Sequence, residues 1–313
     1  MSRPQRPAAI LIAGPTASGK SGIALAIAKA RGGVVINADS MQVYRELRIL
    51  TARPSRADEA AAPHRLYGHI SASEPYSVAR WLADVAVEID SARSANLLPI
   101  IVGGTGLYFK ALLEGLSPVP EIPREVRERW RAAGATLPAA DLHAELSNRD
   151  RETAAALRPS DRQRLVRALE VIEATGTPLV AWHRIKGQPL LALADVAALV
   201  VERPREELYR RSDARFRAMV AEGALDEARH VRDMALSPEL PASRALGLAP
   251  LIDHLDGRLT IDAATAVAAA DTRHYIKRQA TWLRRHMIAW RSVAAQEMET
   301  QLSDIFSFSD FCD

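Results

Sequence analysis

The chain contains 313 residues, of which 48% are apolar and 25% are charged, and its formal net charge is +3. This length exceeds the usual domain of about 100–200 residues, so one enlarged domain or two domains are expected. The sequence has no run of about 18 uncharged apolar residues and no secretory leader, which predicts a cytoplasmic protein rather than a membrane protein. The single cysteine, Cys312, excludes an intramolecular disulfide and a cysteine metal cluster.

The first apolar segment, residues 8–13, leads into a glycine-rich motif of the pattern G-x-x-x-x-G-K-[ST]. The motif consists of Gly14, Pro15, Thr16, Ala17, Ser18, Gly19, Lys20 and Ser21. Its glycines let backbone N–H groups curl around an anion at the start of the helix predicted behind it. Lys20 can then reach terminal phosphates, and the Ser21 hydroxyl can ligate Mg²⁺. The motif predicts a phosphate-binding loop without naming the substrate.

Further apolar runs at residues 34–38, 98–102 and 197–201 have the composition of buried strands, and residues 78–91 have helical spacing. Strands that alternate with helices predict an α/β fold of the P-loop NTPase-like, nucleotide-kinase-like type, with a parallel sheet flanked by helices. Ligands of such sheets bind beyond the carboxyl ends of the strands. The phosphate loop, Asp39 and Thr105 each follow a strand, so we expect them to meet in one cleft.

Three prolines between residues 118 and 123 interrupt this alternation, and residues 124–185 have an almost purely helical pattern. We therefore expect an all-helical insertion domain at residues 118–195, between the two parts of a catalytic core at residues 1–117 and 196–313.

Long helices are predicted over residues 205–235, 242–255 and 262–290. In the last one, Ile276, Ala280, Leu283, Met287 and Trp290 form an apolar stripe, while Lys277, Arg278, Arg284 and Arg285 stand in a segment without acidic residues. This basic face could contact nucleic-acid phosphates or could simply be solvated. The tail at residues 306–311 carries no chemical signal.

Asp39 is the only aspartate that ends an early strand, whereas the strand at residues 98–102 ends in Gly-Gly-Thr without a Mg²⁺-associated acid. Its carboxylate could accept a proton from an incoming acceptor. It could equally cap a following helix, because aspartate is a preferred N-cap residue. Position alone leaves both interpretations open.

Four segments carry a resemblance to a known family. They are the phosphate loop, Asp39-Ser-Met-Gln-Val-Tyr-Arg45, Ile101-Val-Gly-Gly-Thr-Gly-Leu-Tyr108 and Thr272-Arg-His-Tyr-Ile-Lys-Arg-Gln-Ala-Thr-Trp-Leu-Arg284. Over residues 8–290 the chain resembles the bacterial tRNA dimethylallyltransferases, also called tRNA isopentenyltransferases. The resemblance implies transfer of a dimethylallyl group from dimethylallyl diphosphate to N6 of the adenosine just 3′ of the anticodon. The donor's diphosphate, not ATP, would then fill the loop.

The same resemblance implies roles for single residues. Asp39 would be the general base, Thr105 would lie at the substrate channel, and Lys20 and Arg215 would bind the diphosphate, with Mg²⁺ on Ser21. Arg215 could instead be one of six arginines on a surface helix. The tRNA anticodon stem-loop would contact Asp39, Ser40, Met41, Gln42, Thr105, Arg127, Gln163, Arg164, Arg167, Arg244, Lys277, Arg278, Gln279 and Arg284. The target base would have to be flipped out of its stack. We expect the protein to act as a monomer.

Two positions depart from the family pattern, because Leu50 stands where glycine is usual and Leu248 stands where Gly-Tyr is usual. Two other functions remain compatible with the residues. A P-loop small-molecule or nucleoside kinase would use the same loop for ATP and Asp39 for an acceptor hydroxyl, but it would not need the basic C-terminal helix. A non-catalytic RNA-binding protein would leave Lys20, Ser21 and Asp39 unexplained.

Overall fold

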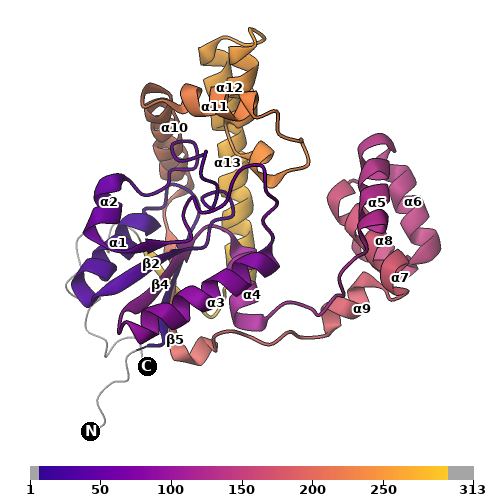
Figure 1. The fold of residues 1–313 in the computed structure, drawn as a ribbon, viewed down its shortest axis with the longest axis horizontal. Helices are drawn as coiled ribbons and strands as arrows, with labels where there is room; N and C mark the ends of the chain where they lie inside the picture. Colours follow the sequence, from indigo (N-terminus) through magenta and orange to yellow (C-terminus); the bar gives the residue numbers. More distant parts are fainter. Residues whose placement is uncertain (1–6, 295–313) are drawn as a thin grey trace. The chain divides into compact units, whose positions relative to one another are not determined.

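The computed structural model describes residues 7–294 (Figure 1). Its centre is a six-stranded sheet in the order β3-β2-β4-β1-β5-β6, with every neighbouring pair parallel. The strands are β1 (Ala9–Ala13), β2 (Gly33–Asn37), β3 (His64–Arg65), β4 (Leu98–Gly103), β5 (Val196–Glu202) and β6 (Arg291–Ala294). The strands β1, β2 and β4 are buried at every residue, as expected for a parallel sheet that helices cover on both faces. The predicted α/β fold is confirmed.

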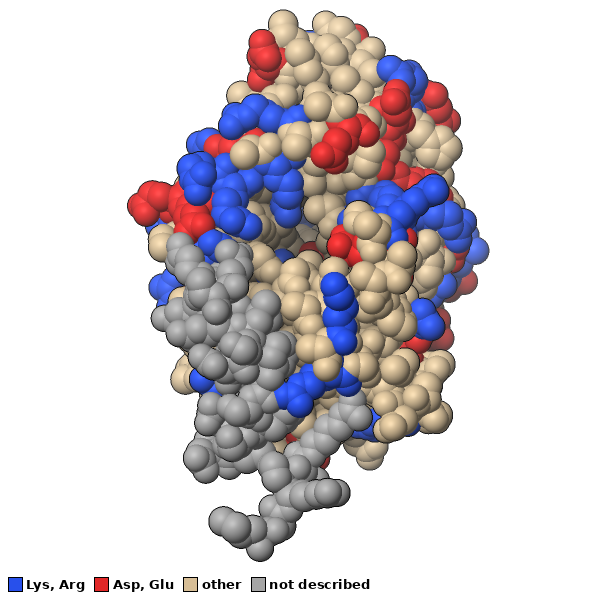
Figure 2. Space-filling model, turned by 90° about the vertical axis from the view of Figure 1, so that its left-hand side faces the viewer, with Lys and Arg blue, Asp and Glu red and all other residues tan. Residues whose placement is uncertain are grey.

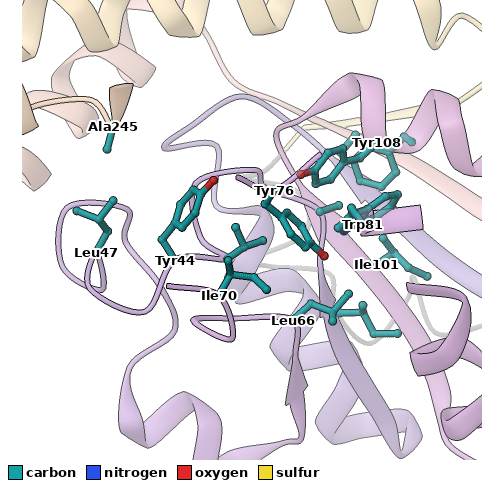
Figure 3. Packing of buried hydrophobic residues seen from close by; sticks show 14 of the residues in the cluster. Tyr44, Leu47, Leu66, Ile70, Tyr76, Trp81, Ile101, Tyr108 and Ala245 are labelled. Carbon is teal, nitrogen blue, oxygen red and sulfur yellow. The ribbon is translucent and has the colours of Figure 1, made fainter. Parts of the chain in front are cut away.

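Successive strand residues pack into two different cores. On one face, Ile10 and Ile12 pack with apolar residues of α1 (Lys20–Arg31). On the other face, Leu11 joins the larger core, to which α3 (Val78–Ser94) and α4 (Gly106–Glu114) contribute. In that core Trp81 stacks on Tyr108 with ring centroids 4.3 Å apart (Figure 3). The indole N–H of Trp81 donates to the carbonyl of Asn37 at 2.8 Å, which ties α3 to the end of β2.

The C-terminal helices are more broken than the sequence predicts. They are α10 (Arg205–Ala221), α11 (Ala224–Asp233), α12 (Leu248–Leu255) and α13 (Ile261–His286), with a short 3₁₀ helix, η2 (Pro241–Arg244), before α12. The predicted continuous helices at 205–235 and 242–255 are wrong. Gly223 and Gly247 adopt φ angles of 113° and 83°, in a left-handed region that interrupts a helix.

The long last helix is confirmed as α13, but it ends at His286 and not at residue 290. Residues 291–294 form β6, which pairs with β5. Its side chains do not alternate between apolar and polar, so the sequence pattern does not predict this strand. Four residues of the predicted apolar stripe are nevertheless buried, since Ile276, Leu283, Met287 and Trp290 are at most 8% exposed. The basic side chains Lys277, Arg278, Arg284 and Arg285 are exposed, as the helical wheel predicts.

The contacts between residues divide the chain into two compact units, and residues 114–189 form one of them. This unit consists of α5 (Arg124–Thr136), α6 (Ala139–Arg149), α7 (Arg151–Ala156), α8 (Arg162–Thr175) and α9 (Leu179–Arg184). It has its own apolar core, which includes Trp130, Leu142, Leu146, Leu165 and Leu169. The helical pattern of residues 124–185 therefore corresponds to a separately packed helical unit. The other unit, residues 1–113 and 190–313, contains the sheet.

Within residues 7–294, no helix is long and apolar enough to cross a bilayer. The short helices α2 (Arg56–Ala61) and η1 (Leu193–Asp195) complete the described elements. The C-terminal segment at residues 306–311 and Cys312 lie outside the described residues.

Candidate active site

The phosphate-binding loop connects β1 to α1, and its backbone explains its residue types. Lys20 is the first residue of α1, while Gly19 and Ala17 have φ angles of 96° and 65°. A Cβ atom on Gly14 would lie 2.7 Å from the Ser18 hydroxyl oxygen and 3.0 Å from the Val201 carbonyl, so no side chain fits there. Left-handed residues next to a helix N-terminus turn backbone N–H groups toward a common point, which makes an anion-binding concavity.

Three arginines from the β5–α10 segment donate hydrogen bonds to this loop. The Nε atoms of Arg203 and Arg211 donate to the carbonyl oxygens of Ser18 and Ala17, at 2.9 and 3.2 Å. Arg215 donates through Nη2 to the hydroxyl oxygen of Thr16 at 2.9 Å. These three hydrogen bonds join the phosphate loop to the β5–α10 segment. The structure thus places Arg215 at the phosphate loop and not on an ordinary surface helix face.

A pocket of about 400 Å³ opens between the loop and α10. Its lining residues are Ala17, Gly19, Lys20, Ser21, Gly22, Ala52, Arg210, Arg211, Ala214 and Arg215. Four of these side chains are basic and none is acidic, so the pocket attracts anions. Figure 2, which shows the side of the molecule on the left of Figure 1, displays Lys and Arg side chains around a hollow in this surface.

The ammonium group of Lys20 has a lowered pKa in this pocket. Desolvation by burial is the largest cause, the negative charge of Asp39 opposes it and the positive charge of Arg215 adds to it, and together they bring the pKa of Lys20 to about 8. Burial also lowers the pKa of Arg215, again against the effect of Asp39. A bound anion would favour the charged form of both groups. The pocket therefore holds cations that gain stabilisation when a phosphate enters.

The lowered pKa of Lys20 predicts a pH dependence of ligand binding. We expect the dissociation constant for an unreactive diphosphate analogue to rise above about pH 8, by up to about tenfold per pH unit, because the free protein then loses the Lys20 proton that the complex retains. Isothermal titration calorimetry between about pH 7 and 9.5 measures this slope. Lys20→Arg is the control, because a guanidinium stays charged over this range. Equal slopes in the parent and Lys20→Arg would contradict the assignment.

Asp39 lies directly behind β2, in a tight turn. Its backbone N–H donates to the Asn37 side-chain oxygen at 2.8 Å, and its Oδ1 accepts the Met41 N–H at 2.9 Å. Turns, and no helix, follow it as far as residue 55, so the interpretation of Asp39 as a helix N-cap is wrong. Its charge acts on Lys20 and Arg215. The turn therefore holds the carboxylate beside the phosphate loop, where it can interact with a further group.

Thr105 joins the end of β4 to the Asp39 turn. Its N–H donates to the Ala38 carbonyl at 3.2 Å, and its hydroxyl oxygen accepts the Ser40 N–H at 3.0 Å. A Cβ atom on Gly103 would lie 2.0 Å from the Ala38 carbonyl oxygen, so only glycine permits this close approach. The predicted convergence of the phosphate loop, Asp39 and Thr105 at one edge of the sheet is present in the structure.

Three tyrosines beside Asp39 escaped the sequence analysis. Burial and the negative charge of Asp39 raise the pKa values of Tyr67, Tyr108 and Tyr275, burial being the larger cause. They come from three segments: the β3–α3 connection, α4 and α13. Tyr108 and Tyr275 stand in recognised motifs and Tyr67 does not, but no local pattern shows that rings so far apart in sequence lie near one carboxylate.

The residues predicted to bind tRNA fall into different environments. Lys277, Arg278, Arg284 and Arg244 are exposed on the core unit. Ser40, Met41 and Gln42 are half-buried, and the Gln42 amide donates to the carbonyls of Thr51 and Ala52 beside the pocket. Gln279 does not match the expectation of a tRNA contact. Its residue is 6% exposed, and its amide is hydrogen-bonded inside the protein.

The other four predicted tRNA ligands belong to the helical unit. Gln163, Arg164 and Arg167 are exposed on α8, where Arg164 pairs with Asp161 and Arg167 pairs with Glu170. Arg127 is half-buried and donates to the Ile122 carbonyl at 3.2 Å. These three arginines thus already have partners in their own unit, which a bound phosphate would have to replace.

The two departures from the family pattern are core positions here. Leu50 is 7% exposed, and its N–H donates to the Glu227 carboxylate at 3.0 Å. Leu248 is 1% exposed and begins α12. Both belong to the large core, so their side chains stabilise the fold.

The residues that the structure describes contain no cluster of three or more His, Cys, Asp or Glu side chains able to hold a metal ion. Ser21 lines the anion pocket next to Lys20 and is exposed. Mg²⁺ usually binds few protein ligands together with substrate phosphates. The hydroxyl of Ser21 fits that kind of site.

A parallel sheet with a phosphate loop after β1 and an acid after β2 defines the class: a P-loop α/β protein with a cationic pocket and a nearby carboxylate. The chain belongs to the IPP transferase family, which it matches over residues 42–286, and residues 7–70 also match the isopentenyl transferases. The predicted family is confirmed.

Several known proteins resemble the chain over nearly its whole length. A tRNA dimethylallyltransferase of Rhodopseudomonas palustris strain BisA53 is 54% identical over 303 residues, which are 96% of this chain and 92% of the relative. The solved full-length tRNA isopentenylpyrophosphate transferase of Bacillus halodurans is 30% identical, with a TM-score of 0.66 and 96% of each chain covered. A eukaryotic dimethylallyltransferase solved acting on tRNA has the same fold, with a TM-score of 0.82 at 24% identity, over 96% of this chain and 78% of its own.

Proposed function

We propose that this protein transfers a dimethylallyl group from dimethylallyl diphosphate to N6 of the adenosine 3′-adjacent to the anticodon of tRNA. The observation that carries the proposal is the position of Asp39 beside Lys20 and Arg215, at the edge of the sheet where the anion pocket opens. A cationic pocket suits a diphosphate leaving group, and a carboxylate suits an amine that must lose a proton. The names of the relatives, which print tRNA together with a dimethylallyl group or isopentenylpyrophosphate, support this choice of substrates.

The reaction follows from these positions. The N6 lone pair attacks C1 of the donor, and the C1–O bond breaks with its electron pair going to the diphosphate. Asp39 accepts the proton that the amine loses. Lys20, Arg215 and the loop N–H groups stabilise the charge that grows on the departing diphosphate, where preorganised donors lower the barrier most. Lys20 donates to the Pro15 carbonyl and Arg215 donates to the Thr16 hydroxyl, so both cations are held at the loop.

Ser21 would hold a Mg²⁺ ion together with oxygens of the diphosphate. When bound, the ion would supply additional positive charge at the leaving group. Lys20, Arg210, Arg211 and Arg215 already make the pocket cationic, and the metal would add to that charge.

Transfer is tested by incubating the protein with unmodified tRNA and labelled dimethylallyl diphosphate, beside a reaction with labelled ATP. Label should appear in tRNA, and nuclease digestion with mass spectrometry should place it on N6 of one adenosine. Transfer of the γ-phosphoryl label from ATP to a small acceptor would support the kinase instead. Binding of tRNA without any label transfer would support the RNA-binding protein.

The exposed basic face of α13 gives a prediction for tRNA binding. Replacing Arg278 and Arg284 by Gln should reduce the slope of log K against log salt by roughly one to two, because each lost phosphate contact removes a slope of about 0.7–0.9. Affinity for the diphosphate analogue should not change. Filter binding or fluorescence anisotropy over a salt series measures the slope.

The matched control removes two positive charges elsewhere. Lys29 and Arg93 lie in the last turns of α1 and α3, just before β2 and β4 begin, and thus at the edge of the sheet opposite the phosphate loop. Gln at both positions should leave the salt slope of tRNA binding unchanged. If both double variants reduced the salt slope equally, tRNA binding would depend on the net charge of the protein and not on the basic face of α13.

A further inference from the structure

The side chain of Gln279 joins two loops of the active site. Its Oε1 accepts the backbone N–H of Thr16 at 2.9 Å, and its Nε2 donates to the Gly104 carbonyl at 2.9 Å. The residue lies in the middle of α13 and is 6% exposed. One amide group therefore satisfies a donor in the phosphate loop and an acceptor behind β4.

Packing around this amide leaves little freedom. A Cβ atom on Gly104 would lie 2.2 Å from Nε2 of Gln279, and one on Gly106 would lie 2.1 Å from the Trp282 ring. Gln279 and Trp282 are three residues apart and lie on neighbouring positions of one helix face. The glycines thus let α13 approach the β4–α4 loop closely, and Gln279 reaches through this contact to the phosphate loop.

The two loops that Gln279 joins carry the residues proposed for the two parts of the reaction, the departure of the diphosphate and the removal of the proton. On one side, the hydroxyl of Thr16 accepts a hydrogen bond from Arg215, and the loop continues to Lys20. On the other side, Gly104 precedes Thr105, whose hydroxyl accepts the Ser40 N–H next to Asp39. Gln279 is a direct hydrogen-bonded link between the leaving-group site and the segment beside the base.

We propose that Gln279 is a positioning residue, which fixes the spacing between the phosphate loop and the Asp39–Thr105 loops, and is not a tRNA contact. The inference rests on the proposed transfer reaction. An amide is required because it both accepts and donates, which neither a carboxylate nor an alkyl side chain of this size does. Displacement of reacting groups by about 1 Å costs up to about 10²-fold in rate, so loss of the link should slow transfer without weakening tRNA binding.

Two substitutions test this spacing. Gln279→Leu removes both hydrogen bonds, and Gln279→Glu keeps the acceptor for Thr16 but places a second acceptor against the Gly104 carbonyl. Single-turnover rates at saturating donor and tRNA should fall by about 10–10² in both variants. The tRNA dissociation constant should stay within about twofold, whereas loss of a true tRNA contact would raise it and would be overcome by saturating tRNA.

A pH series on Gln279→Glu adds a rescue that a merely structural role would not produce. A protonated carboxyl group both donates and accepts, as the amide does, and burial raises the pKa of a glutamate. The rate of Gln279→Glu relative to the parent should therefore rise severalfold from about pH 8.5 to about pH 6, whereas the ratio for Gln279→Leu should stay flat. If Gln279→Leu does not fold, the pH dependence of the Gln279→Glu rate still tests the positioning role.

The controls separate this inference from the proposed function. Thr272, also buried on α13, donates only to the Ala268 carbonyl of its own helix, so Thr272→Val tests general weakening of α13. Its rate should match that of the parent. A parent that transfers no label would defeat the proposed function itself. An active parent with a normal rate in both Gln279 variants, or with a flat pH ratio in Gln279→Glu, would overturn the positioning role alone.

Discussion

Asp39→Asn should slow prenyl transfer by about 10²–10⁴ while donor and tRNA binding stay within a few-fold, since this is the usual loss when a positioned general base is removed. Asparagine can still accept the Met41 N–H, so the turn that holds Asp39 should persist. What it loses is the ability to take the proton from N6. Single-turnover chemistry with preformed donor and tRNA complexes measures the effect on the reaction step.

The outcome also separates the two uses of this carboxylate. If Asp39 only stabilised its turn, Asp39→Asn would react at the rate of the parent, because the turn hydrogen bond is kept. Asn37 offers a comparison, because its side chain accepts the Asp39 N–H and donates to the carbonyls of Asp39 and Leu66 and so stabilises the same turn. Asn37→Ala should lower stability as well as rate, since it removes buried hydrogen bonds.

Lys20→Ala should weaken donor binding and slow transfer together. A hydrogen bond to a charged group is worth about 1.5–3 kcal/mol, so the donor dissociation constant should rise by about 10–10². The rate at saturating donor should fall by a further ~10²–10³, because charge on the leaving diphosphate grows in the transition state. Calorimetry with the unreactive analogue gives the first effect, and single-turnover rates give the second.

Lys29→Ala is the matched control, since Lys29 lies in the last turn of the same helix, away from the loop. It should bind the donor as the parent does. Normal donor affinity together with a normal rate in Lys20→Ala would contradict the assignment of the phosphate loop to the diphosphate. Normal affinity with a slow reaction would restrict Lys20 to the transition state.

The contrast between Asp39 and Gln279 shows where sequence reasoning reaches its limit. Both residues stand in motifs that identify the family, and for Asp39 the position behind a buried strand already indicated the active edge of the sheet. For Gln279 the resemblance implied a tRNA contact, and its neighbours Lys277 and Arg278 are indeed exposed. Only the packing of α13 against Gly104 and Gly106 reveals that its amide points inward.

The sequence by itself determined the features that depend on neighbours along the chain. The spacing of the glycines predicts the phosphate loop, and apolar runs predict β1, β2, β4 and β5. Helical periodicity predicts the buried stripe of α13. Tertiary structure alone decided what depends on distant partners. The strand β6 exists because β5 offers it an edge, and Asp39 acquires its electrostatic partners because β1 and β2 end at the same side of the sheet. Local propensities act over a few residues, whereas burial and hydrogen bonding between loops 60 to 260 residues apart depend on the completed fold.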